Sequence, residues 1–266
     1  MMKLSIFALL GAALTTCDTG VTYTVPVQSV EETQTVQISE IKGSEYATDD
    51  SETNDTFEYV ALGNSVTCNI PCDYWWGTYG MAASSPDKDY VHQVKDYIAN
   101  AANVDVNVKT GSVKDWELST ERNSCFQTFD GVLNEETDLV TVQVGENITE
   151  NKEHLYEDFS NLFLHIGEKA PNAQVIVIGN VLWDFEDVNN VKAQVCADNG
   201  IIYVDMSEFK VSYDTMYKSY VGTTVTDDNG NEHEIWYDCV AAHPNDAGMS
   251  FIAGKINEQI VFKEKR

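Results

Sequence analysis

The segment Val60-Ala61-Leu62-Gly63-Asn64-Ser65-Val66-Thr67 runs from an apolar stretch into a tight polar turn. The short apolar run from Phe57 to Leu62 is typical of a buried strand. Gly63 permits a tight turn directly after that strand, which leaves the Ser65 hydroxyl exposed. The backbone N–H of Ser65 is then free to stabilise a developing negative charge. Taken alone, the segment still favours an ordinary Gly-Asn-Ser turn over a reactive site.

Four more apolar runs follow this first strand, and amphipathic stretches separate them. We expect strands at 104–108, 139–144, 175–178 and 201–204. We expect helices that open at Ser85-Pro86, cover 155–166 and 188–195 (the latter ended by Gly200), and close the chain around 249–260. Strands that alternate with helices predict an α/β fold, a three-layer α/β/α sandwich around a parallel sheet of about five strands. The ligand site of such a sheet lies at the carboxyl ends of its strands.

The N-terminal fifth of the chain differs from the rest in composition. Lys3 followed by the apolar run Leu4–Leu14 predicts a signal peptide over 1–17, which is too short to span a membrane. Ordinary cleavage and secretion is the expected outcome, and a lipid anchor on Cys17 is the alternative. Residues 18–56 are rich in Ser, Thr, Asp and Glu and are expected to form a linker. Residues 57–266 are then one folded domain, which fits a 266-residue chain.

Charge and cysteine content restrict the partners of the chain. With 16 Lys and Arg against 43 Asp and Glu, the net charge of −27 repels nucleic acid and anionic membranes. We therefore expect no nucleic-acid partner, and a monomer. Six cysteines in so long a chain are too sparse for a disulfide framework, although Cys68 and Cys72 are close enough in sequence to pair. They lack a second Cys/His pair at ligand spacing, so we expect no metal.

Three later motifs also lie where the predicted sheet would place a site. Gly111 follows the strand that ends near Lys109, and Asn147 follows the strand that ends at Val144. His243-Pro244 precedes the C-terminal helix. Each alone is equally consistent with a turn glycine, a loop asparagine or a surface histidine. Together with Ser65 they would supply a nucleophile, a base and oxyanion donors at one edge of the sheet.

This set of motifs resembles the SGNH hydrolase family, the GDSL-type lipases and esterases, in both residue type and chain order. Gly63-Asn64-Ser65 is similar to the first block, with Asn64 where Asp is commonest. Gly145-Glu146-Asn147 is similar to the third block, with Ile148 where Asp is usual, and His243-Pro244 matches the fifth. Gly111 occupies the place of the second-block glycine. The resemblance covers roughly residues 57–264 and implies a flavodoxin-like sheet, the SGNH hydrolase fold.

The resemblance implies a mechanism that uses no cofactor. Ser65 would attack an ester carbonyl, and His243 would take its proton and return it to the leaving alcohol. The Ser65 N–H, the Gly111 N–H and the Asn147 side chain would hold the oxyanion. Water would then release the acyl group from Ser65.

The acid of the expected triad is displaced. The family places it three residues before the histidine, and that position here is Val240. We predict that Asp238, five residues before His243, takes its place. The alternative is a Ser–His dyad in which a backbone carbonyl orients the ring.

The motifs and the resemblance therefore predict a secreted serine ester hydrolase that cleaves small acyl esters. Acetyl groups on carbohydrate are one candidate substrate, which rests on the predicted export and on the resemblance alone. A lipase, lysophospholipase or thioesterase is the alternative within enzymes, and a non-catalytic binding module of the same fold is the alternative outside them. Trp75, Trp76 and Trp183 would either line a substrate pocket or pack in the core. The polar segment 223–234, with a turn at Asp227–Gly230, is expected to form a hairpin near the site.

Overall fold

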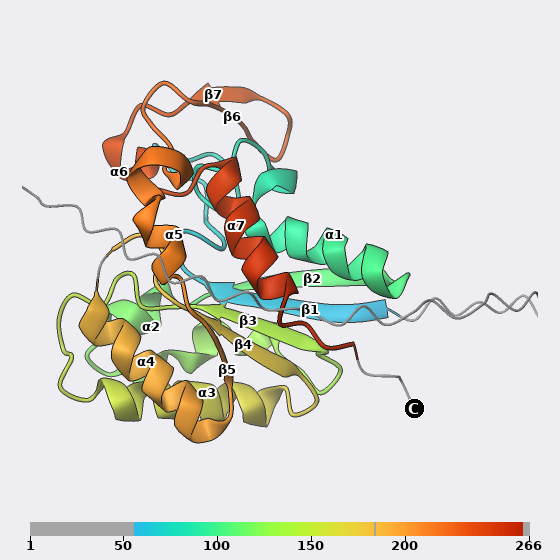
Figure 1. Cartoon of the computed structure of the whole chain (residues 1–266), viewed down its shortest axis with the longest axis vertical. Coiled ribbons are helices and arrows are strands. Elements are labelled where there is room, and N and C mark those ends of the chain that lie inside the picture. Colours follow the sequence, from blue (N-terminus) through green and yellow to red (C-terminus); the bar gives the residue numbers. More distant parts are fainter. Residues whose placement is uncertain (1–55, 184, 263–266) are drawn as a thin grey trace, which may run out of the picture. The chain divides into compact units, whose positions relative to one another are not determined.

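The computed structural model describes residues 56–183 and 185–262, and its elements are shown in Figure 1. The predicted signal peptide, the candidate lipid anchor at Cys17 and the predicted linker up to residue 55 lie outside the described residues. In the described ranges, no helix has both the length and the apolar character needed to cross a membrane. The five cysteines of these ranges all carry free thiols, so Cys68 and Cys72 are not joined here.

A five-stranded parallel sheet forms the centre of the domain, as predicted (Figure 1). Its strands are β1 (Thr56–Gly63), β2 (Asp105–Ser112), β3 (Leu139–Gln143), β4 (Gln174–Ile178) and β5 (Ile202–Val204). The spatial order is β2-β1-β3-β4-β5, so the chain leaves β1 in one direction for β2 and continues in the other direction from β3. The point where the strand order reverses lies between β1 and β3, which is where doubly wound sheets bind ligands.

Helices cover both faces of this sheet, which confirms the three-layer α/β/α sandwich. Helices α1 (Tyr90–Ala102) and α7 (Asp246–Asn257) pack together on one face, and α3 (Leu155–Lys169) and α4 (Glu186–Asn199) pack on the other (Figure 1). Successive β1 residues point to opposite faces: Tyr59 joins the first core and Val60 joins the second. Burial on both faces explains why the strands read as continuous apolar runs.

The start of α1 differs from the prediction. Ser85 and Pro86 open only a 3₁₀ turn (Pro86–Lys88), and α1 begins at Tyr90 with Asp89 as its N-cap. The Asp89 carboxylate accepts a hydrogen bond from the backbone N–H of His92 at 2.8 Å, and it also accepts one from the N–H of Gly80 at 3.0 Å. The Ser85 side chain makes no capping hydrogen bond, so the helix begins where the Asp89 carboxylate caps it.

The remaining elements connect the layers. The predicted hairpin exists as the antiparallel pair β6 (Thr224–Thr226) and β7 (Glu232–Glu234). Gly200 ends α4 in the left-handed conformation, with φ +66°. Short elements complete the described chain: α2 (Lys114–Leu118), 3₁₀ turns Arg122–Thr128 and Asp130–Val132, α5 (Ser207–Val211), a π-helical turn Tyr213–Tyr217, and α6 (Asp238–Ala241).

Candidate active site

The turn that carries Ser65 follows β1 directly, as the sequence predicts. The Asn64 carbonyl accepts hydrogen bonds from the N–H groups of Thr67 at 2.9 Å and Cys68 at 3.0 Å, which closes the turn. A Cβ on Gly63 would lie 1.9 Å from Thr67 Oγ1. Only glycine therefore fits between the strand and the turn, and the segment is more than an ordinary loop.

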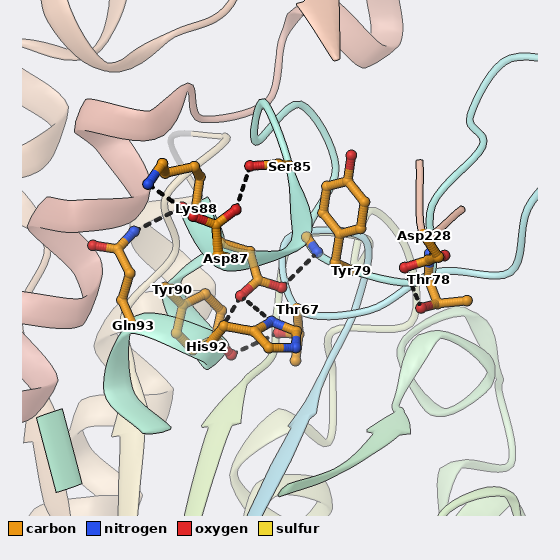
Figure 2. Close-up of polar contacts among 12 residues, drawn as sticks. Thr67, Thr78, Tyr79, Ser85, Asp87, Lys88, Tyr90, His92, Gln93 and Asp228 are labelled. Atoms are coloured by element: carbon orange, nitrogen blue, oxygen red, sulfur yellow. Dashed lines mark hydrogen bonds and ion pairs between the residues drawn. The ribbon is translucent and has the colours of Figure 1, made fainter. Parts of the chain in front are cut away.

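The segment that follows Ser65 holds this turn from several sides. The Ser65 carbonyl accepts hydrogen bonds from the Met81 N–H at 2.8 Å and from Asn69 Nδ2 at 3.0 Å. Thr67 Oγ1 and the Tyr90 hydroxyl lie 2.8 Å apart, which ties the turn to the first residue of α1 (Figure 2). The backbone of the serine is thus fixed while its side chain remains half-buried and accessible.

The predicted hairpin docks on the same segment. Asp228, in the turn between β6 and β7, accepts hydrogen bonds from the Thr78 N–H at 2.8 Å and the Thr78 hydroxyl at 3.1 Å (Figure 2). The Tyr79 hydroxyl donates to the Thr226 carbonyl at 2.6 Å. Because Ser65 is held by the segment that continues to Met81, the hairpin supports the Ser65 turn indirectly.

Ser65 and His243 meet although 178 residues separate them. Ser65 Oγ lies 2.7 Å from His243 Nε2, and His243 Nδ1 lies 2.8 Å from the Cys239 carbonyl oxygen. A carbonyl oxygen only accepts, so Nδ1 carries the proton in the neutral ring. Nε2 is then unprotonated and accepts the hydrogen bond from the Ser65 hydroxyl. This is the tautomer that a general base requires.

The group behind the histidine is a main-chain carbonyl and not the carboxylate of Asp238. Asp238 is the first residue of α6, and its side chain is exposed. The last carbonyls of a helix have no partner within the helix, and nearby histidine side chains satisfy them. The backbone N–H of His243 donates to the Val240 carbonyl at 3.0 Å, and the ring Nδ1–H donates to the Cys239 carbonyl. The geometry thus corresponds to the Ser–His dyad alternative.

Burial sets the protonation of this histidine. His243 is 4% exposed, and this desolvation lowers its pKa to about 4, against the weaker opposing effect of the carbonyls of Cys239 and Val240. A buried imidazole disfavours its charged form unless an anion compensates it. The neutral, proton-accepting form therefore predominates at neutral pH.

Asn147 lies four residues beyond the end of β3, in the loop that follows the strand as predicted. Its Nδ2 donates to Glu117 Oε2 at 2.5 Å, and Asn64 Nδ2 donates to Glu117 Oε1 at 3.0 Å. One carboxylate thus connects Asn147 to the residue immediately before Ser65. The structure therefore brings Ser65, His243 and Asn147 to the carboxyl edge of the sheet.

Gly111 does not follow β2 as predicted, because strand pairing continues to Ser112. Gly111 pairs with Leu62 inside the ladder. A Cβ there would lie 2.7 Å from Leu62 Cδ2 and 3.1 Å from Phe129 Cβ. Close packing therefore favours a glycine at this position, whereas donation from its N–H to an oxyanion stays a prediction.

Glu117 is the site residue that sequence reasoning missed. It lies on the five-residue helix α2, is 1% exposed, and also accepts hydrogen bonds from the N–H groups of Gly145 at 2.5 Å and Glu146 at 3.1 Å. Burial raises the pKa of Glu117, and the hydrogen bonds from Asn147, the Gly145 N–H and Asn64 oppose that shift. Its place between Trp116 and Leu118 offers no spacing signal, since its partners come from two distant loops.

A second buried carboxylate supports the same loop from behind. Glu146 accepts hydrogen bonds from the N–H groups of Val181 at 2.5 Å and Trp183 at 3.2 Å, which follow β4. The buried Lys192 donates to the Val144 carbonyl and to Asn180 Oδ1. Burial lowers the pKa of Lys192 to about 8, against the weaker opposing effect of the Glu146 charge. Charged groups that are almost fully buried thus surround the loop that carries Asn147.

The three tryptophans considered for a substrate pocket differ in burial. Trp75 is fully buried in the core, Trp76 stacks on His233 with ring centroids 4.4 Å apart, and Trp183 is 42% exposed. His233 is half-buried beneath the Trp76 ring. Across 56–183 and 185–262, no group of three or more His, Cys, Asp or Glu side chains is arranged to hold a metal ion.

Three exposed aromatic rings cluster around the residues that lead into α6. Tyr74, Trp236 and Tyr237 form a surface cluster in which the Tyr237 ring lies 5.2 Å from Tyr74 and 5.5 Å from Trp236. Tyr237 is two residues before Cys239, whose carbonyl contacts the histidine. Exposed apolar patches of this kind are typical of binding surfaces.

Comparison with known proteins identifies the fold. No family model matches the sequence, and no curated protein matches it closely. Among solved structures, the chain is similar to an extracellular lipase from Streptomyces rimosus, with 16% identity, a TM-score of 0.52, and coverage of 77% of this chain and 100% of the lipase. It is also similar to a putative GDSL-like lipase from Bacteroides uniformis, with 14% identity, a TM-score of 0.50, and coverage of 77% and 95%.

A third similar structure is a two-domain esterase active on acetylated mannans, crystallised with mannopentaose. Its identity is 14% and its TM-score 0.51, with 79% of this chain and 50% of the esterase covered. At such identities the likeness shows the fold, and it confirms the SGNH hydrolase fold that the motifs predicted.

Proposed function

We propose that this chain, which has the SGNH hydrolase fold, is a serine ester hydrolase that forms an acyl-enzyme on Ser65. The observation that carries the proposal is the 2.7 Å contact between Ser65 Oγ and His243 Nε2. A serine within hydrogen-bond reach of a histidine, itself oriented by a third group, is the general signature of an activated nucleophile. Ester hydrolysis also fits the lipases and esterases that share the fold.

In the proposed reaction, His243 Nε2 takes the hydroxyl proton as Ser65 Oγ bonds to the ester carbonyl carbon. The Ser65 N–H and the free N–H of the Asn147 amide stabilise the carbonyl oxygen as it becomes negative. The protonated His243 then gives its proton to the leaving alcohol. Water, deprotonated by the same nitrogen, attacks the acyl group and restores the free Ser65.

The third member of this machinery is the Cys239 carbonyl in place of a carboxylate. It accepts a hydrogen bond from Nδ1–H at 2.8 Å, so it holds the ring in the reactive tautomer. It supplies no formal charge to the imidazolium, which agrees with the low pKa of His243. We therefore propose a dyad with main-chain orientation rather than a triad through Asp238.

The proposed substrates are small acyl esters, with acetyl groups on carbohydrate preferred. The exposed rings of Tyr74, Trp236 and Tyr237 beside the Cys239 segment offer flat apolar faces for a sugar ring. The mannan esterase of the same fold acts on such a substrate. The same rings would also accept a fatty acyl chain, so a lipase is the second candidate. The apolar N-terminal run supports export as the proposed location.

Purified protein assayed on p-nitrophenyl acetate, a long-chain p-nitrophenyl ester and acetylated xylan tests both points. We expect hydrolysis of acetyl esters and a loss of about 10⁴-fold or more in kcat in Ser65→Ala. Equal activity in wild type and Ser65→Ala, or no hydrolysis of any ester, would refute the proposal. Preference for the long-chain ester would identify the chain as a lipase instead.

A further inference from the structure

The Asn147 side chain needs a defined orientation to act as an oxyanion donor. An amide group presents an NH₂ on one side and a carbonyl oxygen on the other, and rotation by 180° exchanges them. With the oxygen toward the substrate, the amide would repel the developing negative charge. Some neighbouring group must therefore decide which end of the Asn147 amide faces the reacting carbonyl.

Glu117 is the neighbour that makes this decision. Its Oε2 lies 2.5 Å from Asn147 Nδ2, and a carboxylate accepts but does not donate. The amide nitrogen, not the oxygen, must therefore face Glu117. One of the two Nδ2–H bonds is used by the carboxylate, and the other remains available for the oxyanion.

The other oxygen of Glu117 fixes the same carboxylate to the surrounding loops. Oε1 accepts from Asn64 Nδ2 at 3.0 Å, from the Gly145 N–H at 2.5 Å and from the Glu146 N–H at 3.1 Å. All three partners of Oε1 point hydrogens at it, so a proton on this oxygen would have no acceptor to bind. Asn64 Oδ1 in turn accepts from the Val66 N–H at 3.2 Å, so the carboxylate also holds the turn around Ser65.

We propose that Glu117 is a positioning residue that fixes the Asn147 amide with its free N–H toward the ester oxyanion and at a set distance from Ser65. This inference rests on the proposed ester hydrolysis. It also accounts for Asn64: an aspartate there would place a second carboxylate against Glu117, whereas asparagine supplies a donor. Because Glu117 connects Asn64 to Asn147 before any substrate binds, the Asn147 amide does not need to reorient during the reaction.

The test is a double-mutant cycle on acetyl ester hydrolysis. Asn147→Ala removes the donor and should lower kcat by about 10²–10³-fold with little change in KM, because the interaction forms only in the transition state. Glu117→Gln should lower kcat to a similar extent, since its amide can donate to Asn147 Oδ1 and turn the group round. The double variant should be no slower than Asn147→Ala alone.

Asp89→Asn is the matched control, because Asp89 is also a buried carboxylate that accepts only from N–H groups, those of Gly80 and His92. Any loss it causes should multiply with that of Asn147→Ala. If the Glu117→Gln and Asn147→Ala losses also multiply, Glu117 acts as a general structural residue and the inference is wrong.

A swapped pair covers the case in which Glu117→Gln alone does not fold. Glu117→Gln/Asn147→Asp keeps a hydrogen bond at this place with donor and acceptor exchanged, so it should recover stability. It lacks an N–H for the oxyanion and should stay as slow as Asn147→Ala. Recovery of wild-type kcat in the swapped pair would overturn the inference.

A measurement independent of turnover separates this inference from the proposed function. The side-chain amide of Asn147, followed by ¹⁵N NMR, should show one proton that resonates downfield and exchanges slowly, and Glu117→Gln should abolish it. An unchanged resonance would overturn the positioning role even in an active enzyme. Conversely, undiminished activity in Ser65→Ala would refute the ester hydrolase proposal without affecting the NMR result.

Discussion

The two halves of the proposed site are built by different means. On the base side, His243 is held by a main-chain carbonyl at the end of the four-residue helix α6, whose Asp238 and Cys239 side chains are exposed. On the oxyanion side, Asn147 is held by the side chain of Glu117, in a region that also buries Glu146 and Lys192. The base side should therefore tolerate substitution around the histidine, whereas the oxyanion side should not.

Replacing the histidine itself should give the largest effect. In His243→Ala, the Ser65 hydroxyl loses its only described proton acceptor, and kcat should fall by about 10⁴-fold or more. Steady-state hydrolysis of p-nitrophenyl acetate measures this loss. Because each residue needs the other, Ser65→Ala/His243→Ala should be no slower than either single variant, and a further fall would show that the two do not act as a unit.

The oxyanion side should respond most strongly in stability. In Lys192→Met, the Val144 carbonyl and Asn180 Oδ1 lose their donor, and the buried Glu146 loses the cation nearby. Breaking a buried charge arrangement from one side typically costs about 3–5 kcal/mol of unfolding free energy. Urea unfolding measures it. Lys152→Met, which removes a half-exposed cation paired with Asp187, is the control and should cost under about 1 kcal/mol.

The pH dependence should report the uncharged support of the base. Because burial lowers the pKa of His243 to about 4, the acidic limb of kcat/KM should lie near pH 4 rather than near the ordinary histidine value of 6.5. Between these pH values the unfolded chain binds a proton that the native site does not. The contribution of His243 to the free energy of unfolding therefore has its full value above pH 6.5. It decreases as the pH falls toward 4.

A pH–rate profile and urea unfolding at several pH values check both expectations. In His243→Gln the contribution to the pH slope of stability should disappear. An acidic limb near pH 6.5 would mean that an anion, such as the Asp238 carboxylate, stabilises the imidazolium during the reaction.

The smallest effect is expected for Asp238. Since the Cys239 carbonyl and not this side chain contacts Nδ1, Asp238→Ala should leave kcat within about two-fold of wild type. Asp238→Asn, assayed in parallel, separates charge from size. A loss of 10²-fold or more in both variants would show that the carboxylate moves onto the ring when substrate binds.

The sequence predicted those parts of the site that follow a strand. Ser65 and Asn147 each come after an apolar run, and parallel strands bring their carboxyl ends to one edge, so the placement of both residues at that edge was foreseeable. The five strands and the sandwich followed from the same alternation. The prediction that Gly111 follows strand β2 was wrong, because pairing with β1 continues as far as Ser112. Local sequence does not reveal how far a neighbouring strand prolongs the pairing.

Two features depended on contacts that spacing cannot show. Whether the carboxylate of Asp238 or the carbonyl of Cys239 meets His243 is decided by the short helix α6, which has too few residues for a periodic signal. Glu117 gathers donors from residues 28 to 53 positions away, and nothing in its neighbourhood distinguishes it from a surface acid. Buried polar networks are assembled by the fold, so they become visible only in it.

The carbonyl behind His243 gives the site an unusual pattern of mutational robustness. Every amino acid carries a main-chain carbonyl, so no amino-acid substitution at position 239 deletes the group that contacts the His243 ring. The vulnerability lies instead in chain length: inserting or deleting one residue between Cys239 and His243 would turn a different carbonyl, or none, toward the ring. Residue 239 can therefore change its identity during evolution, provided that the number of residues between positions 239 and 243 is preserved.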